Sequence, residues 1–242
     1  MTRDDIFGGR LKLLQPDSGP RVNMDTMLLA AYVRAPFRGA HCFVELGSAT
    51  GAVSLILALR FPGRLRLLGV ELQPELVELA ERNRLENGLS DRVSFLQGDL
   101  RDPELLKGEI FDGLVVNPPY ETPGRGRTSP DRARAMARQG LHCTPEDVAE
   151  AAKRLLKEKG RFFSVFRAES AIRFLNALSA CGLAPKRLRW VHPRASRPAS
   201  LFLLEALKGG GEGLTVEPPL YVHDEQKRYT PELLKAYELE GI

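Results

Sequence analysis

The sequence predicts an α/β fold with a doubly wound, mainly parallel sheet. Short apolar runs that suit buried strands alternate along the 242 residues with longer stretches that have the periodicity of helices. This alternation is typical of βαβ units, in which a helix connects one parallel strand to the next. The runs 187–193 and 200–207 have no helical stretch between them, so we expect these two strands to pair antiparallel.

The order of elements follows from the apolar runs and from the residues that begin and end helices. Strands are expected at 42–47, 66–72, 93–99, 111–116 and 161–166, before the antiparallel pair. Helices are expected at 52–61, 74–88, 144–160 and 169–182. Pro74 suits a first helical turn and Thr144 suits an N-cap. Gly88 and Gly160 suit helix ends, and the tail is expected to form an edge segment and a short helix capped at Thr230.

Composition limits the class of protein. A content of 43% hydrophobic and 27% charged residues is ordinary for a soluble globular chain. No apolar run approaches the roughly 20 residues that cross a bilayer, and the charged start lacks the apolar segment of a secretory signal. Cys42, Cys143 and Cys181 are widely spaced, which argues against a disulfide framework or a metal site and favours a reducing cytoplasm. The net charge of +4 permits a nucleic-acid partner without requiring one.

The stretch VELGSATGAVSL, residues 44–55, is a strand, a turn of small residues and a helix start. Gly47, Ala49 and Gly51 let the backbone approach a ligand beside a helix N-terminus, although such turns also serve packing. Glu71 lies twenty residues after Gly51 at a strand end, where a carboxylate can accept both hydrogen bonds of a ribose diol. Glu45 would repel a pyrophosphate but suits a cationic amino group. The pattern therefore favours S-adenosylmethionine over NAD.

Asp99 closes the next strand, in the sequence QGDL. Its carboxylate can accept from an adenine amino group, while Leu100 offers a backbone N–H to the ring. The alternative is a turn cap that leads into Pro103. Because the carboxyl ends of parallel strands meet at one edge of a sheet, we expect Glu45, Glu71 and Asp99 to face one crevice.

The sequence VVNPPY ends a strand and suits a site that binds a planar amino group. The side-chain oxygen of Asn117 and the carbonyl of Pro118 can accept hydrogen bonds from a planar amino group, and Pro119 stiffens the turn without adding a donor. Tyr120 offers a face on which a base can stack. Two acceptors would direct the nitrogen lone pair at a sulfonium methyl group, and positioning then replaces a strong base. The alternative is an ordinary strand-ending turn.

The motifs VELGSATG, GVELQPE, GDL and NPPY resemble those of class I S-adenosylmethionine-dependent methyltransferases of the amino-methylating (D/N)PPY group. The stretch 21–33 and the C-terminal segment are similar to bacterial tRNA1(Val) adenine-37 N6-methyltransferases. This resemblance implies a Rossmann-like sheet of seven strands with the last one inserted antiparallel. It implies three parts: an N-terminal extension at 1–40 that packs on the catalytic domain, a methyltransferase domain at 41–207 and a C-terminal extension at 208–242.

The resemblance also implies roles for residues that match the motifs. Implied donor contacts are Glu45, Gly47, Ala49, Gly51, Glu71, Leu72, Asp99, Leu100 and Asn117. The implied catalytic turn is Asn117, Pro118, Pro119 and Tyr120. This chain departs from the pattern twice, because Ala49 replaces the usual middle glycine and Glu45 stands where Asp is more frequent.

The stretch 121–140 has five arginines against two acids, a local net charge of +3. A long loop beside the catalytic turn suits phosphate binding, although a solvated lid would have the same composition. The arginines expected to bind RNA are Arg125, Arg127, Arg132 and Arg134. In the family that the chain resembles, the segment NMDT lies over the donor pocket, so the resemblance implies that Asp25 or Thr26 contacts the donor or the target base. A helix cap is the alternative.

Further arginines on the expected strand 187–193 and in the connection that follows it are expected to extend this basic surface. They are Arg187, Arg189, Arg194 and Arg197. Trp190 and His192 offer rings for stacking, with a place in the core as the alternative for Trp190.

Together these features predict a methyltransferase acting on the exocyclic N6 amine of adenine in RNA, with the anticodon region of a tRNA as the expected target. Alternatives are a protein glutamine N5-methyltransferase, an amino-methyltransferase of ribosomal RNA or DNA, and an RNA-binding module without activity. The chain is expected to act in the cytoplasm as a monomer, without a metal or a membrane.

Overall fold

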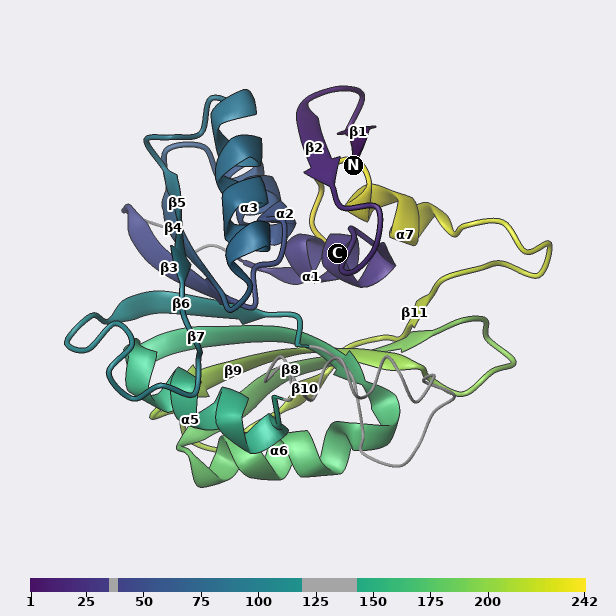
Figure 1. The fold of residues 1–242 in the computed structure, drawn as a ribbon. Coiled ribbons are helices and arrows are strands. Elements are labelled where there is room, and N and C mark those ends of the chain that lie inside the picture. The colour runs from purple at the N-terminus through teal and green to yellow at the C-terminus, as the bar shows by residue number, and fades with distance from the viewer. Residues whose placement is uncertain (35–38, 119–142) are drawn as a thin grey trace.

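The computed structural model describes residues 1–34, 39–118 and 143–242, and within these ranges it shows a sheet of nine strands (Figure 1). The strand order is β10-β8-β9-β7-β6-β3-β4-β5, and β11 also pairs with β8. The seven long strands are β3 (His41–Leu46), β4 (Leu65–Glu71), β5 (Val93–Gln97), β6 (Phe111–Val116), β7 (Leu156–Arg167), β8 (Leu183–His192) and β9 (Leu201–Lys208). The two short strands are β10 (Thr215–Val216) and β11 (Leu220–Tyr221).

The directions of the strands confirm the predicted fold class. Strands β3 to β7 run parallel to one another, whereas β9 lies antiparallel between β7 and β8. The pairing of Trp190 with Phe202 in the β8–β9 hairpin confirms the antiparallel pair expected from the missing helix. The expected seven strands are present, and the two-residue strands β10 and β11 are added at the edge by the C-terminal segment.

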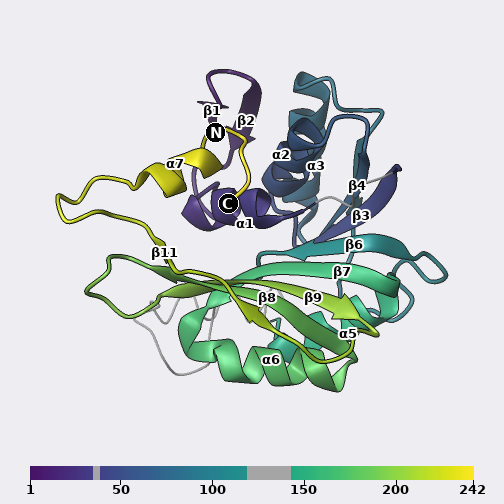
Figure 2. The same cartoon turned by 180° about the vertical axis from the view of Figure 1, so that it is seen from behind.

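Helices cover both faces of the sheet (Figures 1 and 2). One face carries α1 (Met24–Tyr32), α2 (Ala52–Arg60), α3 (Pro74–Glu86) and α7 (Pro231–Ala236); the other carries α5 (Pro145–Leu155) and α6 (Ala171–Ala180), which follows the single turn η1 (Ala168–Ser170). Each face has its own apolar cluster of buried side chains. None of the helices in the described ranges is long and apolar enough to cross a membrane.

Most expected helix ends are confirmed, and one is wrong. Pro74 begins α3, and Thr144 caps α5 in a reciprocal arrangement with Asp147. Gly160 does not end α5, because the helix stops at Leu155 and the next residue already belongs to β7. Leu156 is buried and pairs with β6, so strand pairing ends the helix before the glycine is reached.

An N-terminal hairpin of β1 (Thr2–Ile6) and β2 (Leu11–Gln15) packs beside α3. Asn87 accepts from the N–H of Lys12 (2.9 Å) and donates to its carbonyl (2.7 Å). Asn83, one helical turn earlier, does the same for Leu14 at 2.7 and 3.1 Å. The two side-chain amides therefore pair with the open edge of β2 as a neighbouring strand would.

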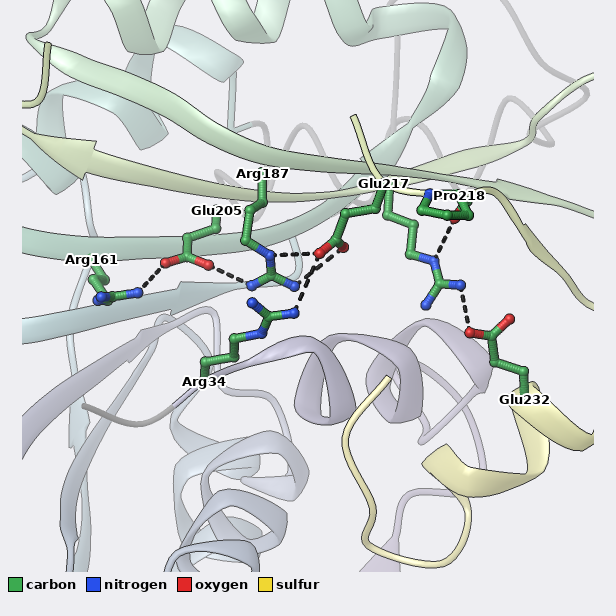
Figure 3. A network of polar contacts seen from close by, with 8 residues as sticks. Arg34, Arg161, Arg187, Glu205, Glu217, Pro218 and Glu232 are labelled. Atoms are coloured by element: carbon green, nitrogen blue, oxygen red, sulfur yellow. Dashed lines mark hydrogen bonds and ion pairs between the residues drawn. The ribbon is translucent and has the colours of Figure 1, made fainter. Parts of the chain in front are cut away.

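An ion-pair network joins the antiparallel end of the sheet to the C-terminal segment (Figure 3). Glu205 on β9 binds Arg161 on β7 and, at 2.5 Å, Arg187 on β8. Arg187 also binds Glu217 at 2.8 Å, and its guanidinium lies 4.3 Å from the centre of the Tyr32 ring. This network holds the segment after β10 against both the sheet and α1.

Two arginines that were expected on a basic RNA surface are therefore structural, and that expectation was wrong. Arg187 is engaged by two carboxylates, and Arg189 is only 6% exposed. Arg189 binds Glu232 at 2.6 Å and the carbonyl of Pro218 at 2.9 Å. Both arginines alternate with apolar residues on β8 and face the C-terminal segment, so they fasten that segment to the sheet.

We expect Glu205→Ala to lower the free energy of unfolding by about 3 kcal/mol, because it leaves the largely buried Arg187 with one partner fewer. Urea unfolding measures this change. Glu212→Ala, at an exposed position, is the control and should change stability by less than about 0.5 kcal/mol. Equal effects of the two substitutions would show that the network adds nothing to stability.

Candidate active site

The glycine turn between β3 and α2 lies directly on β4. Gly47, Ala49 and Gly51 all have left-handed φ values, at 69°, 47° and 80°. The N–H groups of Gly47 and Ser48 both donate to the carbonyl of Val70, at 2.8 and 3.0 Å. For Ala49, the departure from the family pattern, this conformation costs roughly 1–2 kcal/mol. Bonds from neighbouring elements hold the turn in this shape.

Gly51 shows how closely the turn packs. A Cβ atom at Gly51 would lie 2.4 Å from the ring of Phe95 on β5, so a side chain there would collide with the strand. A Cβ atom at Gly47 would meet nothing within 4 Å. The first glycine therefore faces open space, while the last one packs on the sheet.

Glu45 is buried beneath this turn with 3% of its surface exposed. Its Oε2 accepts from the backbone N–H of Ser54 at 2.9 Å and from the Ser54 hydroxyl at 2.5 Å. Burial raises the pKa of Glu45 to about 8, and the bonds from Ser54 oppose this rise. Ser54 is a partner that sequence reasoning missed, although a serine in the first turn of the following helix was a visible signal.

Glu71 at the end of β4 holds the other side of the turn. Its Oε2 accepts from the N–H of Ala49 at 2.9 Å, and its Oε1 accepts from the N–H of Gln73 at 3.0 Å. Only 6% of the residue is exposed. The structure thus brings Glu45 and Glu71 together around one turn, as the strand ends predicted, but Glu71 also shapes the turn itself. Leu72 follows it at the same edge.

Asp99 lies just beyond the end of β5 and is bound by Arg101. The carboxylate accepts from the Arg101 N–H at 2.9 Å and from its guanidinium at 2.6 Å. Hydrogen bonding to Arg101 lowers the pKa of Asp99. The turn cap considered as an alternative role is therefore present, and about a third of the Asp99 side chain is still exposed. The carbonyl of Leu100 accepts from Arg154 at 2.9 Å. This bond does not involve the Leu100 N–H, which is the group expected to contact the adenine ring.

Asn117 follows β6 at the same edge of the sheet as the glycine turn. Val116 pairs with Leu46, so Asn117 and Gly47 leave two adjacent strands at the same level. Neighbouring strands lie about 4.8 Å apart. Asn117 is half-buried and Pro118 is buried. Pro119 and Tyr120 lie outside the described residues, as do Arg125, Arg127, Arg132 and Arg134.

Asp25 lies on the first turn of α1 and does not cap it. The cap is Asn23, whose side chain accepts from the Thr26 N–H at 3.1 Å. Burial raises the pKa of Asp25, and Arg167 at the end of β7 opposes this rise. The N-cap alternative for this stretch is thus fulfilled by Asn23, and Asp25 lies near the carboxyl edge of the sheet.

Two further residues of the site were missed by sequence reasoning. Asn83, fully buried on α3, donates to the carbonyl of Thr50 at 3.0 Å and so ties the glycine turn to the N-terminal hairpin. Ser48, in the turn itself, has a buried hydroxyl without a hydrogen-bond partner among the described residues. Its place between two glycines was the available signal.

These residues fit S-adenosylmethionine. The donor carries an ammonium group, a ribose diol and an adenine, which match buried carboxylates, strand-end acceptors and an open backbone turn at a helix N-terminus. Two observations support a donor bound at the glycine turn. The Ser48 hydroxyl has no hydrogen-bond partner among the described residues, and the space that a side chain at Gly47 would fill is open. Within the described part of the chain, no cluster of three or more His, Cys, Asp or Glu residues is arranged to hold a metal ion.

The burial of Glu45 predicts that this group destabilises the fold as the pH rises. The pKa of Glu45 is about 8 in the folded chain, above its ordinary value of 4.5. Between these values the folded state binds more protons than the unfolded state, so the free energy of unfolding falls with increasing pH. We expect Glu45→Gln, which cannot ionise, to flatten this dependence in urea unfolding across that window. If the free energy of unfolding of Glu45→Gln fell with pH as steeply as that of the wild type, the raised pKa of Glu45 would be contradicted.

Comparisons with known proteins agree with this geometry. The sequence model of the methyltransferase-domain family matches residues 40–175. A relative from Tolumonas auensis, named tRNA1(Val) (adenine(37)-N6)-methyltransferase, is 28% identical over 88% of this chain and 86% of its own length. A relative of the same name from Porphyromonas gingivalis is 34% identical over 65% of this chain and 63% of its own length.

Solved structures share the fold. A protein from Agrobacterium tumefaciens, described as a predicted O-methyltransferase, is 25% identical and has a TM-score of 0.72, covering 90% of this chain and 97% of that one. A geranyl diphosphate methyltransferase in complex with SAM is 15% identical with a TM-score of 0.54, over 76% and 84% of the two chains.

The family match spans the glycine turn, the strand-end carboxylates and Asn117. These are the groups that the structure gathers at the carboxyl edge of the sheet, where ligands of doubly wound folds bind. The chain therefore belongs to the methyltransferase-domain family, and it is an S-adenosylmethionine-dependent methyltransferase.

Proposed function

We propose that this enzyme methylates the exocyclic N6 amine of an adenine in the anticodon region of a tRNA. The observation that carries the proposal is the position of Asn117, which leaves β6 beside the glycine turn and begins the sequence NPPY. Relatives that carry the name tRNA1(Val) (adenine(37)-N6)-methyltransferase match most of the chain, which supports adenine as the target.

The donor residues divide by the group that they would hold. Glu45 suits the ammonium end, Glu71 the ribose diol and Asp99 the adenine amine. The remaining contacts would come from Gly47, Ala49, Gly51, Leu72 and Leu100, largely through the backbone. When bound, S-adenosylmethionine supplies an electrophilic methyl group on a sulfonium.

The acceptor side rests on Asn117 and its neighbours. The Asn117 oxygen and the Pro118 carbonyl would accept hydrogen bonds from the adenine NH2, which leaves its lone pair directed at the donor. The methylated amine then releases its proton, so no strong base is needed. Pro119 stiffens the turn, and Tyr120 would stack on the extruded base.

The phosphates of an RNA substrate call for cations as partners. Arg125, Arg127, Arg132 and Arg134 suit the phosphates of the RNA, and Asp25 suits the donor or the target base. We assign residues 41–207 to the methyltransferase domain, with 1–40 and 208–242 as extensions. We expect the enzyme to act as a monomer in the cytoplasm without a metal.

Methyl transfer from labelled S-adenosylmethionine to separate pools of tRNA, ribosomal RNA, DNA and cell protein tests the proposal. We expect label in tRNA, recovered as N6-methyladenosine after digestion to nucleosides. Label in protein alone would indicate glutamine methylation instead, and label in ribosomal RNA or DNA alone would move the substrate to that nucleic acid.

We expect Asn117→Ala to lower kcat for tRNA by about 10²-fold or more, because an acceptor for the reacting amine is lost. The dissociation constant for S-adenosylmethionine, measured by calorimetry, should change far less than kcat, because Asn117 is only one of nine implied donor contacts. Asn176→Ala, at an exposed position on α6, is the matched control and should behave as the wild type. A large loss of donor affinity with unchanged kcat would contradict the acceptor role of Asn117.

A further inference from the structure

Two loops from distant parts of the sequence project from the same end of the sheet (Figures 1 and 2). They are the loop between β8 and β9, residues 193–200, and the loop between β11 and α7, residues 223–229, which we call the loop pair. The N–H of His223 donates to the carbonyl of Pro193 at 3.1 Å, and the N–H of Val222 donates to the carbonyl of His192 at 2.9 Å. Backbone bonds thus hold the two loops together at their bases.

The loop pair presents cations whose side chains do not maintain its shape. Arg194, Arg197 and Lys227 are exposed, and among the described residues none of their charged groups has an ion-pair or hydrogen-bond partner. The turn at 194–197 is closed by the backbone, because the Arg197 N–H donates to the Arg194 carbonyl at 3.0 Å. Arg228 differs, since Asp224 binds it at 2.9 Å. The three cations can therefore meet an external anion, and their removal should leave the loops intact.

An aromatic surface lies at the base of the loop 223–229, where His223 meets Pro193 of the other loop. Tyr229 is 49% exposed, which is high for a ring of this size. Its ring centre lies 5.1 Å from that of His223 and 6.4 Å from that of Tyr237, and the two tyrosine rings are within 14° of parallel. Rings that support one another and remain exposed are suited to stacking on an unpaired base.

The loop pair lies at the same edge of the sheet as the reaction site. Strand β8 is antiparallel to β9, which is antiparallel to β7, so β8 ends on the side where β6 ends at Asn117. Three strand intervals separate β6 from β8, which is about 14 Å at the usual spacing of ~4.8 Å. Stacked nucleotides rise about 3.4 Å each, so the interval corresponds to about four nucleotides.

We propose that the loop pair is a second RNA-binding surface, which holds the strand that flanks the target adenine. Arg194, Arg197 and Lys227 bind its phosphates, and Tyr229 stacks on an unpaired base. This inference rests on the proposed function, since an RNA substrate carries both the phosphates and the unpaired bases that such a surface would bind.

The triple variant Arg194→Ser, Arg197→Ser and Lys227→Ser tests the phosphate contacts. We expect the apparent KM for tRNA to rise about tenfold, and the slope of log KM against log salt to fall by about 2, at ~0.7 per single-strand phosphate. The values of kcat and of the donor dissociation constant should stay unchanged. The charge-matched control replaces Arg66, Lys107 and Lys159 with Ser, since these exposed cations lie toward the amino ends of the strands. Urea unfolding checks that loss of the Lys107–Glu104 pair and of the Lys159 bond to the Gly209 carbonyl leaves the control folded.

Substitutions of Tyr229 separate stacking from charge. We expect Tyr229→Ala to raise the KM for tRNA about fivefold without changing the salt slope, whereas Tyr229→Phe should keep the wild-type value. Filter binding of labelled tRNA gives the same comparison without catalysis. If the triple variant binds and methylates tRNA with the wild-type affinity, KM and salt slope, this inference is overturned and the proposed function stands. A wild-type enzyme that neither binds nor methylates RNA would overturn the proposed function as well.

Discussion

The site depends on the way in which the glycine turn is fastened to β4. Three of five successive residues, from Gly47 to Gly51, have left-handed backbone conformations, which a free chain rarely holds together. The Val70 carbonyl accepts two N–H groups from this turn, and Glu71 accepts a third. An open backbone cradle is thereby fixed beside the N-terminus of α2 before any ligand arrives. Such preorganisation leaves less ordering to be done when the donor binds.

The two ends of the chain support this arrangement from outside the sheet core. On one side Asn83 connects the glycine turn with the N-terminal hairpin, through the carbonyls of Thr50 and Leu14. On the other side the network around Glu205 fastens the C-terminal segment to β8 and α1. That segment then carries the loop 223–229 to the reaction edge. The N-terminal and C-terminal extensions thus contribute to function by positioning the glycine turn and the loop 223–229.

The sequence predicted much of the fold, because periodicity and helix signals are local. It placed the strands, the antiparallel pair and the gathering of Glu45 with Glu71, all of which follow from strand ends in a parallel sheet. It did not predict the end of α5, because the pairing of Leu156 with β6 ends the helix before the chain reaches Gly160. Nor did it predict the role of Arg187, whose partners lie on β9 and in the segment after β10, or of Asn83, whose partner Leu14 is 69 residues away. Long-range contacts of this kind leave no local signal.

One fastened turn both shapes the site and, as we propose, holds the donor. The most direct measurement is the dissociation constant of S-adenosylmethionine for the wild type and for Glu71→Ala, determined by calorimetry on samples shown to be folded. We expect the loss of the Glu71 carboxylate to weaken donor binding by about tenfold or more, since a hydrogen bond to a charged group is worth roughly 1.5–3 kcal/mol. An unchanged dissociation constant in a folded Glu71→Ala variant would show that Glu71 does not hold the donor.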